Sequence, residues 1–153
     1  MTNNDILRQL RYTFDFSDDQ MMEIFALGDM IASRSKISNW LKKEEDPEME
    51  KIVDQELAIF LNGFIILKRG KKDGPTPAPE KFLNNNDIFK KLKIALSLKS
   101  NDIIAAFALI NKHITESELS AFFRNHKQAQ YRPVNDQYLR NFLHGLQMTY
   151  RPK

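Results

Sequence analysis

Apolar residues recur every three or four positions along most of this chain, and no segment alternates apolar and polar residues as a strand would. That spacing places the apolar side chains on one face of a helix. The clearest such stretches follow residues 5, 17, 33 and 54, and a second set begins at residue 87. The pattern predicts an all-α fold built from two sets of four helices.

The second set repeats the first at a fixed offset of 82 residues. Asn3-Asn4-Asp5-Ile6 recurs as Asn85-Asn86-Asp87-Ile88, and 18 of the 69 pairs from 3/85 to 71/153 are identical without a gap. Such self-similarity indicates that one helical unit was duplicated in tandem.

A stretch rich in glycine and proline separates the two copies, and it disfavours helix and favours an extended connector. We therefore predict a helical repeat unit at 1–71, a linker at 72–84 and a second unit at 85–153. A unit of about 70 residues is near the limit of independent stability. We accordingly expect the two units to pack together through a shared core.

Polar residues mark where the helices begin. Asn4 can cap the first helix, so the repeated Asn-Asn-Asp is interpreted as cap chemistry. Ser17 with Gln20, and Thr115 with Glu118, have the spacing of capping boxes. Two glycines lie inside the fourth helices, where glycine is costly, and they predict close helix approach at Gly63 and Gly145.

The fourth helix of the first copy is apolar nearly all round, whereas its counterpart is not. Ala58, Ile59, Ile65 and Leu67 become Arg140, Asn141, Gln147 and Thr149 in the second copy. A helix that is apolar all round must be covered on both sides. The candidate interface residues on this helix are Ile59, Ile65, Ile66 and Leu67.

Composition narrows the class of protein. The 153 residues include 42% hydrophobic residues and no cysteine, which fits a buried core and a reducing cytosol. No export signal opens the chain, and no apolar run approaches the roughly 20 residues of a bilayer span. We expect a cytoplasmic protein with no membrane contact.

The net charge of +3 is divided unevenly, with −2 on residues 1–72 and +5 on residues 73–153. A basic surplus can attract polyanions, and solvated lysines on a helical surface explain it equally well.

No residues assemble into recognisable catalytic chemistry. The histidines His113, His126 and His144 lack metal-site spacing with carboxylates, and there is no glycine-rich phosphate loop. Asp54 and Asp136 occur at equivalent positions, where helix capping and the helix dipole favour aspartate as much as catalysis would. We expect no enzyme activity, no metal or cofactor site, and no small-molecule substrate.

One segment resembles the turn and recognition helix of repressor-like helix-turn-helix proteins. Residues 32–42 read apolar, Ser, three variable positions, then apolar-Ser-x-Trp-Leu. The resemblance weakens at Leu27 and Ile31, which replace the usual alanine and glycine, and the second copy carries Glu116 and Glu118. With a second basic run, the candidate nucleic-acid-binding residues are Arg34, Lys36, Asn39, Lys42, Lys43, Lys90, Lys91 and Lys93.

Three motifs together resemble a known family. They are the segment from Asn3 to Tyr12, then Ser38 to Glu44 with Asp46-Pro47, and then Phe60-Leu61-Asn62-Gly63. In combination they resemble the YehS-like family of bacterial proteins, a tandem domain of unknown function. The resemblance covers almost the whole chain and implies a bacterial cytoplasmic protein with two helical repeats, but it implies no activity or site.

Two functional hypotheses follow. The first is a non-enzymatic binding module that holds a protein partner or a second copy of itself. The alternative is a DNA- or RNA-binding regulator that uses the helix-turn-helix-like element at 32–43.

Overall fold

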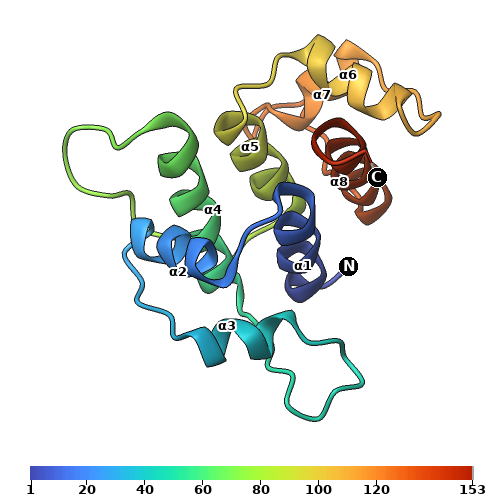
Figure 1. The fold of residues 1–153 in the computed structure, drawn as a ribbon. Helices are drawn as coiled ribbons and strands as arrows, with labels where there is room; N and C mark the ends of the chain where they lie inside the picture. The colour runs from blue at the N-terminus through green and yellow to red at the C-terminus, as the bar shows by residue number, and fades with distance from the viewer. Residues whose placement is uncertain (153) are drawn as a thin grey trace. The chain divides into compact units, whose positions relative to one another are not determined.

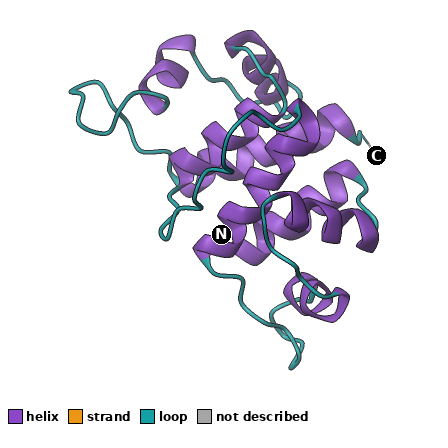
Figure 2. Ribbon diagram, turned by 90° about the vertical axis from the view of Figure 1, so that its left-hand side faces the viewer, coloured by secondary structure: helices purple, strands orange, loops and turns teal. Residues whose placement is uncertain are grey.

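The computed structural model describes residues 1–152, and this part of the chain contains eight α-helices and no strand (Figures 1 and 2). The chain divides into two compact units, Met1–Leu83 and Asn84–Lys153. Each unit contributes four of the helices. The all-α fold predicted from the apolar spacing is therefore confirmed.

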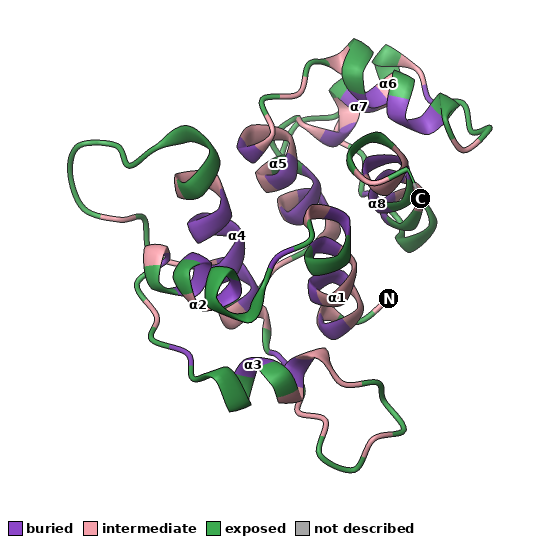
Figure 3. Ribbon diagram, in the orientation of Figure 1, coloured by how far each residue is buried: buried purple, intermediate pink, exposed green. Residues whose placement is uncertain are grey.

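In unit 1 the longest helix contributes the most buried residues to the core. The helices are α1 (Asn3–Phe14), α2 (Asp18–Leu27), α3 (Arg34–Leu41) and α4 (Asp54–Arg69). α2 packs along α4, and α3 contacts both α1 and α2. The ring of Phe25 lies 5.2 Å from that of Trp40 and 5.1 Å from that of Phe60, and all three side chains are fully buried. Figure 3 shows buried stretches on each of these four helices. The apolar stripes of the helices thus meet in one aromatic core.

Unit 2 repeats this arrangement with α5 (Asn85–Ala95), α6 (Ser100–Ala108), α7 (Glu116–Phe122) and α8 (Asp136–Tyr150). α6 packs along α8 as α2 packs along α4. Phe89 stacks on Phe142 with ring centroids 4.0 Å apart, and Phe107 lies on the other side of Phe142. The buried aromatic residues of the second core are all phenylalanine, because Phe122 replaces the tryptophan.

Glycines allow the central helices to cross closely. A Cβ at Gly63 would lie 1.9 Å from the carbonyl oxygen of Ile24, and one at Gly145 would lie 2.6 Å from that of Ala106. No side chain fits at such distances, so the close approach predicted at both glycines is confirmed. Gly28 makes a further close approach to α4, which the sequence analysis did not anticipate.

Most predicted helix starts are confirmed, but one cap is wrong. Ser17 and Thr115 form the expected capping boxes. The first helix begins at Asn3 and is capped by Thr2, not by Asn4. The reason is that the Asn4 side chain bonds a distant loop, as described below.

Some apolar residues expected in the core lie at its edge. Leu109 is 55% exposed because α6 ends at Ala108 and Leu109 is the capping residue. Half-buried positions at the rim of the cores are Phe14, Leu27, Leu41, Ile110 and Phe123.

The connector between α4 and α5 contains neither helix nor strand. Near its end the connector is attached to unit 1, since the Leu83 amide donates to Oδ2 of Asp54 at 2.9 Å. None of the helices in the described residues is long and apolar enough to cross a bilayer.

Candidate functional site

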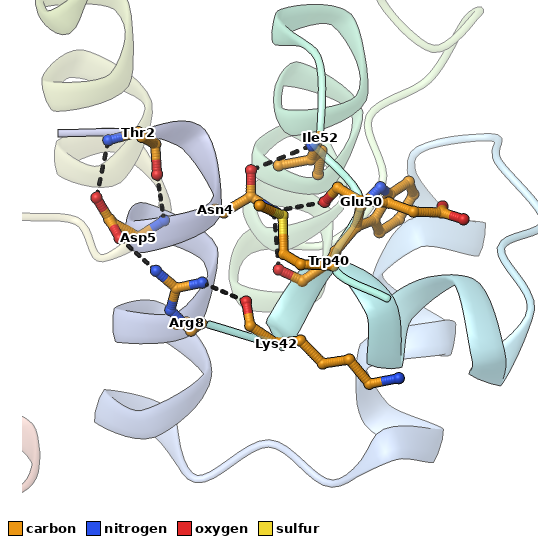
Figure 4. A network of polar contacts seen from close by, with 9 residues as sticks. Thr2, Asn4, Asp5, Arg8, Trp40, Lys42, Glu50 and Ile52 are labelled. Carbon is orange, nitrogen blue, oxygen red and sulfur yellow. Dashed lines mark hydrogen bonds and ion pairs between the residues drawn. The ribbon is translucent and has the colours of Figure 1, made fainter. Parts of the chain in front are cut away.

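A buried asparagine on the first helix holds the long loop of unit 1, residues 42–53, in place (Figure 4). Nδ2 of Asn4 donates to the carbonyl oxygens of Trp40 at 2.9 Å and Glu50 at 2.7 Å. Its Oδ1 accepts from the Ile52 amide at 3.2 Å. One side chain therefore satisfies three backbone groups at both ends of the loop.

Unit 2 contains the same clamp on its long loop, residues 123–135. Nδ2 of Asn86 donates to the carbonyl oxygens of Phe122 at 3.1 Å and Arg132 at 2.9 Å, and its Oδ1 accepts from the Val134 amide at 2.9 Å. In the repeated Asn-Asn-Asp, the second asparagine is therefore a loop clamp rather than a helix cap, and the aspartate belongs to the capping box. The recurrence of two successive asparagines was the available signal, because a cap needs only one.

The preceding asparagine holds the aspartate that begins the fourth helix. Nδ2 of Asn3 lies 2.8 Å from Oδ1 of Asp54, and Nδ2 of Asn85 lies 2.8 Å from Oδ1 of Asp136. The hydrogen bond from Asn85 lowers the pKa of Asp136. The two aspartates are thus carboxylates held by structural hydrogen bonds from asparagine.

Asp5, the third residue of the repeated motif, closes the capping box of α1. Burial raises the pKa of Asp5, but hydrogen bonds from Thr2 and the charge of Arg8 outweigh burial and lower it overall. Arg8 pairs with Asp5 and also donates to the Lys42 carbonyl oxygen at 2.8 Å. Arg8 therefore ties α1 to the start of the long loop.

The basic residues of the helix-turn-helix-like element face carboxylates of their own unit. Arg34 pairs with Asp19 at 2.6 Å and with Asp18 at 3.4 Å. Two further pairs involve the long loop, with Lys36 of α3 at 3.2 Å from Glu50, and Lys42 at 2.9 Å from Glu48 within the loop. Asn39 accepts a hydrogen bond from Lys42, and Lys43 is exposed.

The connection between α2 and α3 spans residues 28–33, which is longer than the three or four residues of a helix-turn-helix. Of the residues predicted to contact nucleic acid, those from Arg34 to Lys43 are brought together at α3, and the charges of Arg34, Lys36 and Lys42 are offset locally.

Equivalent positions carry opposite charges in the two units. Where unit 1 pairs Lys36 with Glu50, unit 2 has Glu118 and Arg132, whose charge helps to lower the pKa of Glu118. The largest cause of that lowered pKa is a hydrogen bond from the Tyr138 hydroxyl, at 2.6 Å. The same hydrogen bond raises the pKa of Tyr138.

The second predicted basic run lies on α5. Lys90 is exposed, whereas Lys91 and Lys93 are half-buried. Nζ of Lys93 lies 5.2 Å from the centroid of the Phe123 ring, so the run borders the start of the long loop of unit 2. This run belongs to unit 2, whereas the element at 32–43 belongs to unit 1.

The four candidate interface residues lie on the second half of α4, apart from Ile59. Ile59, Ile65 and Ile66 are half-buried, and Leu67 is exposed (Figure 3). The α2–α3 connection, where Gly28 approaches Ile59 of this helix, carries Ile31, which is 97% exposed. From the sequence, Ile31 stood out only as a departure from the helix-turn-helix pattern, and its exposure was not predicted.

Two open grooves can be described, one in each unit. The larger has a volume of about 790 Å³ and runs between α7 and residues 129–132 of the long loop of unit 2. A smaller groove of about 520 Å³ lies beside the start of α1. Within residues 1–152, no three His, Asp or Glu side chains gather as metal ligands would.

The fold and these sites define a tandem pair of small helical units, each closed by an asparagine clamp. The chain belongs to a family described as "Protein of unknown function (DUF1456)", whose model matches it twice, at residues 3–70 and 85–151. A relative from Escherichia coli (strain K12), "Uncharacterized protein YehS", is 40% identical over 147 residues, which cover 95% of this chain and 94% of the relative. No solved structure matches the chain.

Proposed function

We propose that the protein is a non-enzymatic binding module, and that unit 1 binds protein through apolar residues on the α2–α3 connection and on α4. The observation that carries this proposal is a difference between the two units. Ile31, Ile59 and Ile65 of unit 1 correspond to His113, Asn141 and Gln147 of unit 2.

The fold itself does not require these residues to be apolar. Since the units share one architecture, a position needed for the core is apolar in both, as Phe25 and Phe107 are. Ile31 is 97% exposed, and burying a side chain of that size stabilises a complex by about 1.5–3 kcal/mol. Apolar residues found on only one unit therefore fit a contact that only this unit makes.

The occupant we propose first is a second copy of the chain. In a two-fold dimer each apolar surface faces its own copy, so one exposed patch is buried twice. A heterologous partner would bury it once and would need a matching surface of its own.

A photo-crosslinking amino acid at Ile31 tests the proposal, with the same amino acid at His113 as the matched control. We expect a covalent dimer from position 31 and none from position 113. Sedimentation velocity should show association with increasing concentration, and Ile31→Asp should shift it towards monomer. A protein that stays monomeric and gives no adduct at position 31 would contradict the proposal.

The ion pairs of α3 weigh against the helix-turn-helix-like alternative at 32–43. A phosphate placed beside Lys36 or Lys42 would lie close to Glu50 or Glu48 as well. Exposed pairs are individually weak, but their carboxylates remain next to the ligand and repel it.

A further inference from the structure

The basic residues of unit 2 are distributed differently from those of unit 1. Residues 1–83 contain 12 Lys+Arg against 15 Asp+Glu, a net charge of −3, whereas residues 84–153 contain 11 against 5, a net charge of +6. A compact unit of that size with such a surplus has a strongly positive field.

The clearest change of sign is at the tip of the long loop. Residues 43–46 of unit 1 read Lys-Glu-Glu-Asp, and the equivalent residues 125–128 of unit 2 read Asn-His-Lys-Gln. The loop of unit 2 is held in shape at its tip, because the Asn125 amide donates to Oε1 of Gln128 and the Lys127 amide donates to Oδ1 of Asn125. His126 and Lys127 are exposed on this turn.

The helix α5 extends the same basic surface. Lys93 lies over the Phe123 ring, and Arg124 follows Phe123 at the start of the loop. In unit 1, Arg8 donates a hydrogen bond to the carbonyl oxygen of Lys42. In unit 2, Lys90 is equivalent to Arg8, and Arg124 is equivalent to Lys42. Lys90 therefore occupies the position that faces the start of the loop.

These cations form no ion pairs with carboxylates in the described part of their own unit. Arg8 pairs with Asp5, but the shorter Lys90 makes no such pair with Asp87, whose carboxylate accepts from the Asn84 amide. Among residues 1–152, no ion pair involves Lys90, Lys93, Arg124 or Lys127. In unit 1, by contrast, Lys36 pairs with Glu50 and Lys42 pairs with Glu48.

The acidic residues of α7 lie at its other end. Glu116 and Glu118 are in the first turn, and the helix of seven residues is about 10 Å long. Glu118 is also bonded to Tyr138 and Thr115. Arg124 lines the same groove as Glu116 and Glu118, so it is the cation of this surface that lies nearest to the α7 carboxylates, whereas Lys127 lies on the loop tip outside that groove's lining.

We propose that this basic ridge, formed by Lys90, Lys93, Arg124 and Lys127, binds the phosphate backbone of a nucleic acid. The four residues are spread over a helix and a long loop, from Lys90 to Lys127, which suits an extended polyanion better than a small anion. Contacts to the backbone position a nucleic acid without reading its sequence. The ridge lies on unit 2, so this proposal is independent of the protein-binding surface of unit 1.

Fluorescence anisotropy with labelled 20-nucleotide single-stranded RNA, single-stranded DNA and duplex DNA tests the ridge. Binding to at least one probe is expected at 50 mM salt, and the three probes distinguish which nucleic acid fits. For four phosphate contacts, the logarithm of the affinity for a duplex should fall with the logarithm of salt with a slope of about −3.6.

The matched variants carry the same change in net charge. Arg124→Glu with Lys127→Glu should weaken binding at least about tenfold, since two backbone contacts are replaced by repulsion. Lys99→Glu with Lys112→Glu, on exposed residues at the start of α6 and on the α6–α7 connection, should weaken it much less. Circular dichroism checks that both variants keep their helix content.

A gain-of-function variant completes the test. Glu44→His with Glu45→Lys transfers the tip of the unit 2 loop onto unit 1 and should strengthen binding. The proposal is overturned if no probe binds at 50 mM salt, or if both double variants weaken binding equally, since net charge alone would then explain it. Capture of an acidic protein by the ridge without any nucleic-acid binding would overturn it as well.

Discussion

Asn4 is the residue on which the position of the long loop of unit 1 depends. It is 3% exposed and satisfies three buried backbone groups. Asn4→Ala leaves these groups without a partner, and each unpaired buried group costs about 1–3 kcal/mol. We expect a loss of about 2–4 kcal/mol in the free energy of unfolding, measured by urea denaturation.

Asn4→Asp distinguishes the hydrogen bonds from the volume of the side chain. A carboxylate still accepts from Ile52, but it cannot donate to the carbonyls of Trp40 and Glu50. It should therefore destabilise the protein at least as much as alanine does. Asn101→Ala, on an exposed residue of α6, is the control and should change stability by less than about 0.5 kcal/mol. If Asn4→Asp is as stable as the native protein, the clamp does not work as described.

The Glu118–Tyr138 pair makes stability depend on pH. The lowered pKa of Glu118 contributes stability above its ordinary value of 4.5, and this is lost as the pH falls through the folded-state value. The raised pKa of Tyr138 contributes stability below 10.0, which is lost as the pH rises through the folded-state value.

Tyr138→Phe should therefore lower the melting temperature at neutral pH, by the equivalent of about 1 kcal/mol for a partly solvated bond. The difference from the native protein should shrink below about pH 4.5 and above about pH 10. Tyr131→Phe, on the neighbouring loop, is the control and should show no such pH dependence. A difference that is constant from acid to alkali would point to packing instead.

What the sequence could predict at this scale was limited by distance along the chain. The capping boxes of Ser17 and Thr115 are visible because their partners lie three residues away. The partners of Asn4 lie 36 to 48 residues away, so the repeated asparagines could be noticed but their role could not be derived.

At the scale of elements, the closeness of the two helix crossings predicts which glycine is more costly to replace. The Cβ of Gly63→Ala would meet the Ile24 carbonyl at 1.9 Å, whereas that of Gly145→Ala would meet the Ala106 carbonyl at 2.6 Å. Both must push backbones apart, which typically costs 1–3 kcal/mol or more, against a gain of about 1 kcal/mol in helix propensity. We expect Gly63→Ala to lower the melting temperature more than Gly145→Ala.

Ser120→Ala, on an exposed helical position, controls for the gain in helix propensity and should be nearly neutral. If Gly63→Ala stabilises the protein as a free helical glycine would, α2 and α4 do not cross at that distance. These crossings were predictable from sequence because glycine recurs inside both fourth helices. The third one, at Gly28, was not, since a glycine at the end of a helix is ordinary.

At the scale of the whole molecule, the duplication works as an internal comparison. Positions that are apolar in both copies, such as Leu57 and Leu139, are buried in both. Positions that differ, such as Ile59 and Asn141, mark where the units diverged. The sequence revealed this divergence on α4, but the contrast between paired and unpaired cations needed the side-chain positions.

The prediction that the units share a core can be tested by following one unit while the other is damaged. Trp40 is the single tryptophan of the chain and lies buried in unit 1, so its fluorescence reports on that unit. Leu143 is buried in unit 2, and Leu143→Ala should cost about 2–5 kcal/mol.

If the units share a core, they unfold together, and Leu143→Ala moves the urea transition of Trp40 fluorescence as far as that of circular dichroism. If each unit is stable alone, the Trp40 transition stays in place while the circular dichroism curve splits in two. We expect the first result, because a unit of about 70 residues buries too little surface to be independent of its neighbour. An unchanged Trp40 transition would show instead that the duplicated units are thermodynamically separate domains.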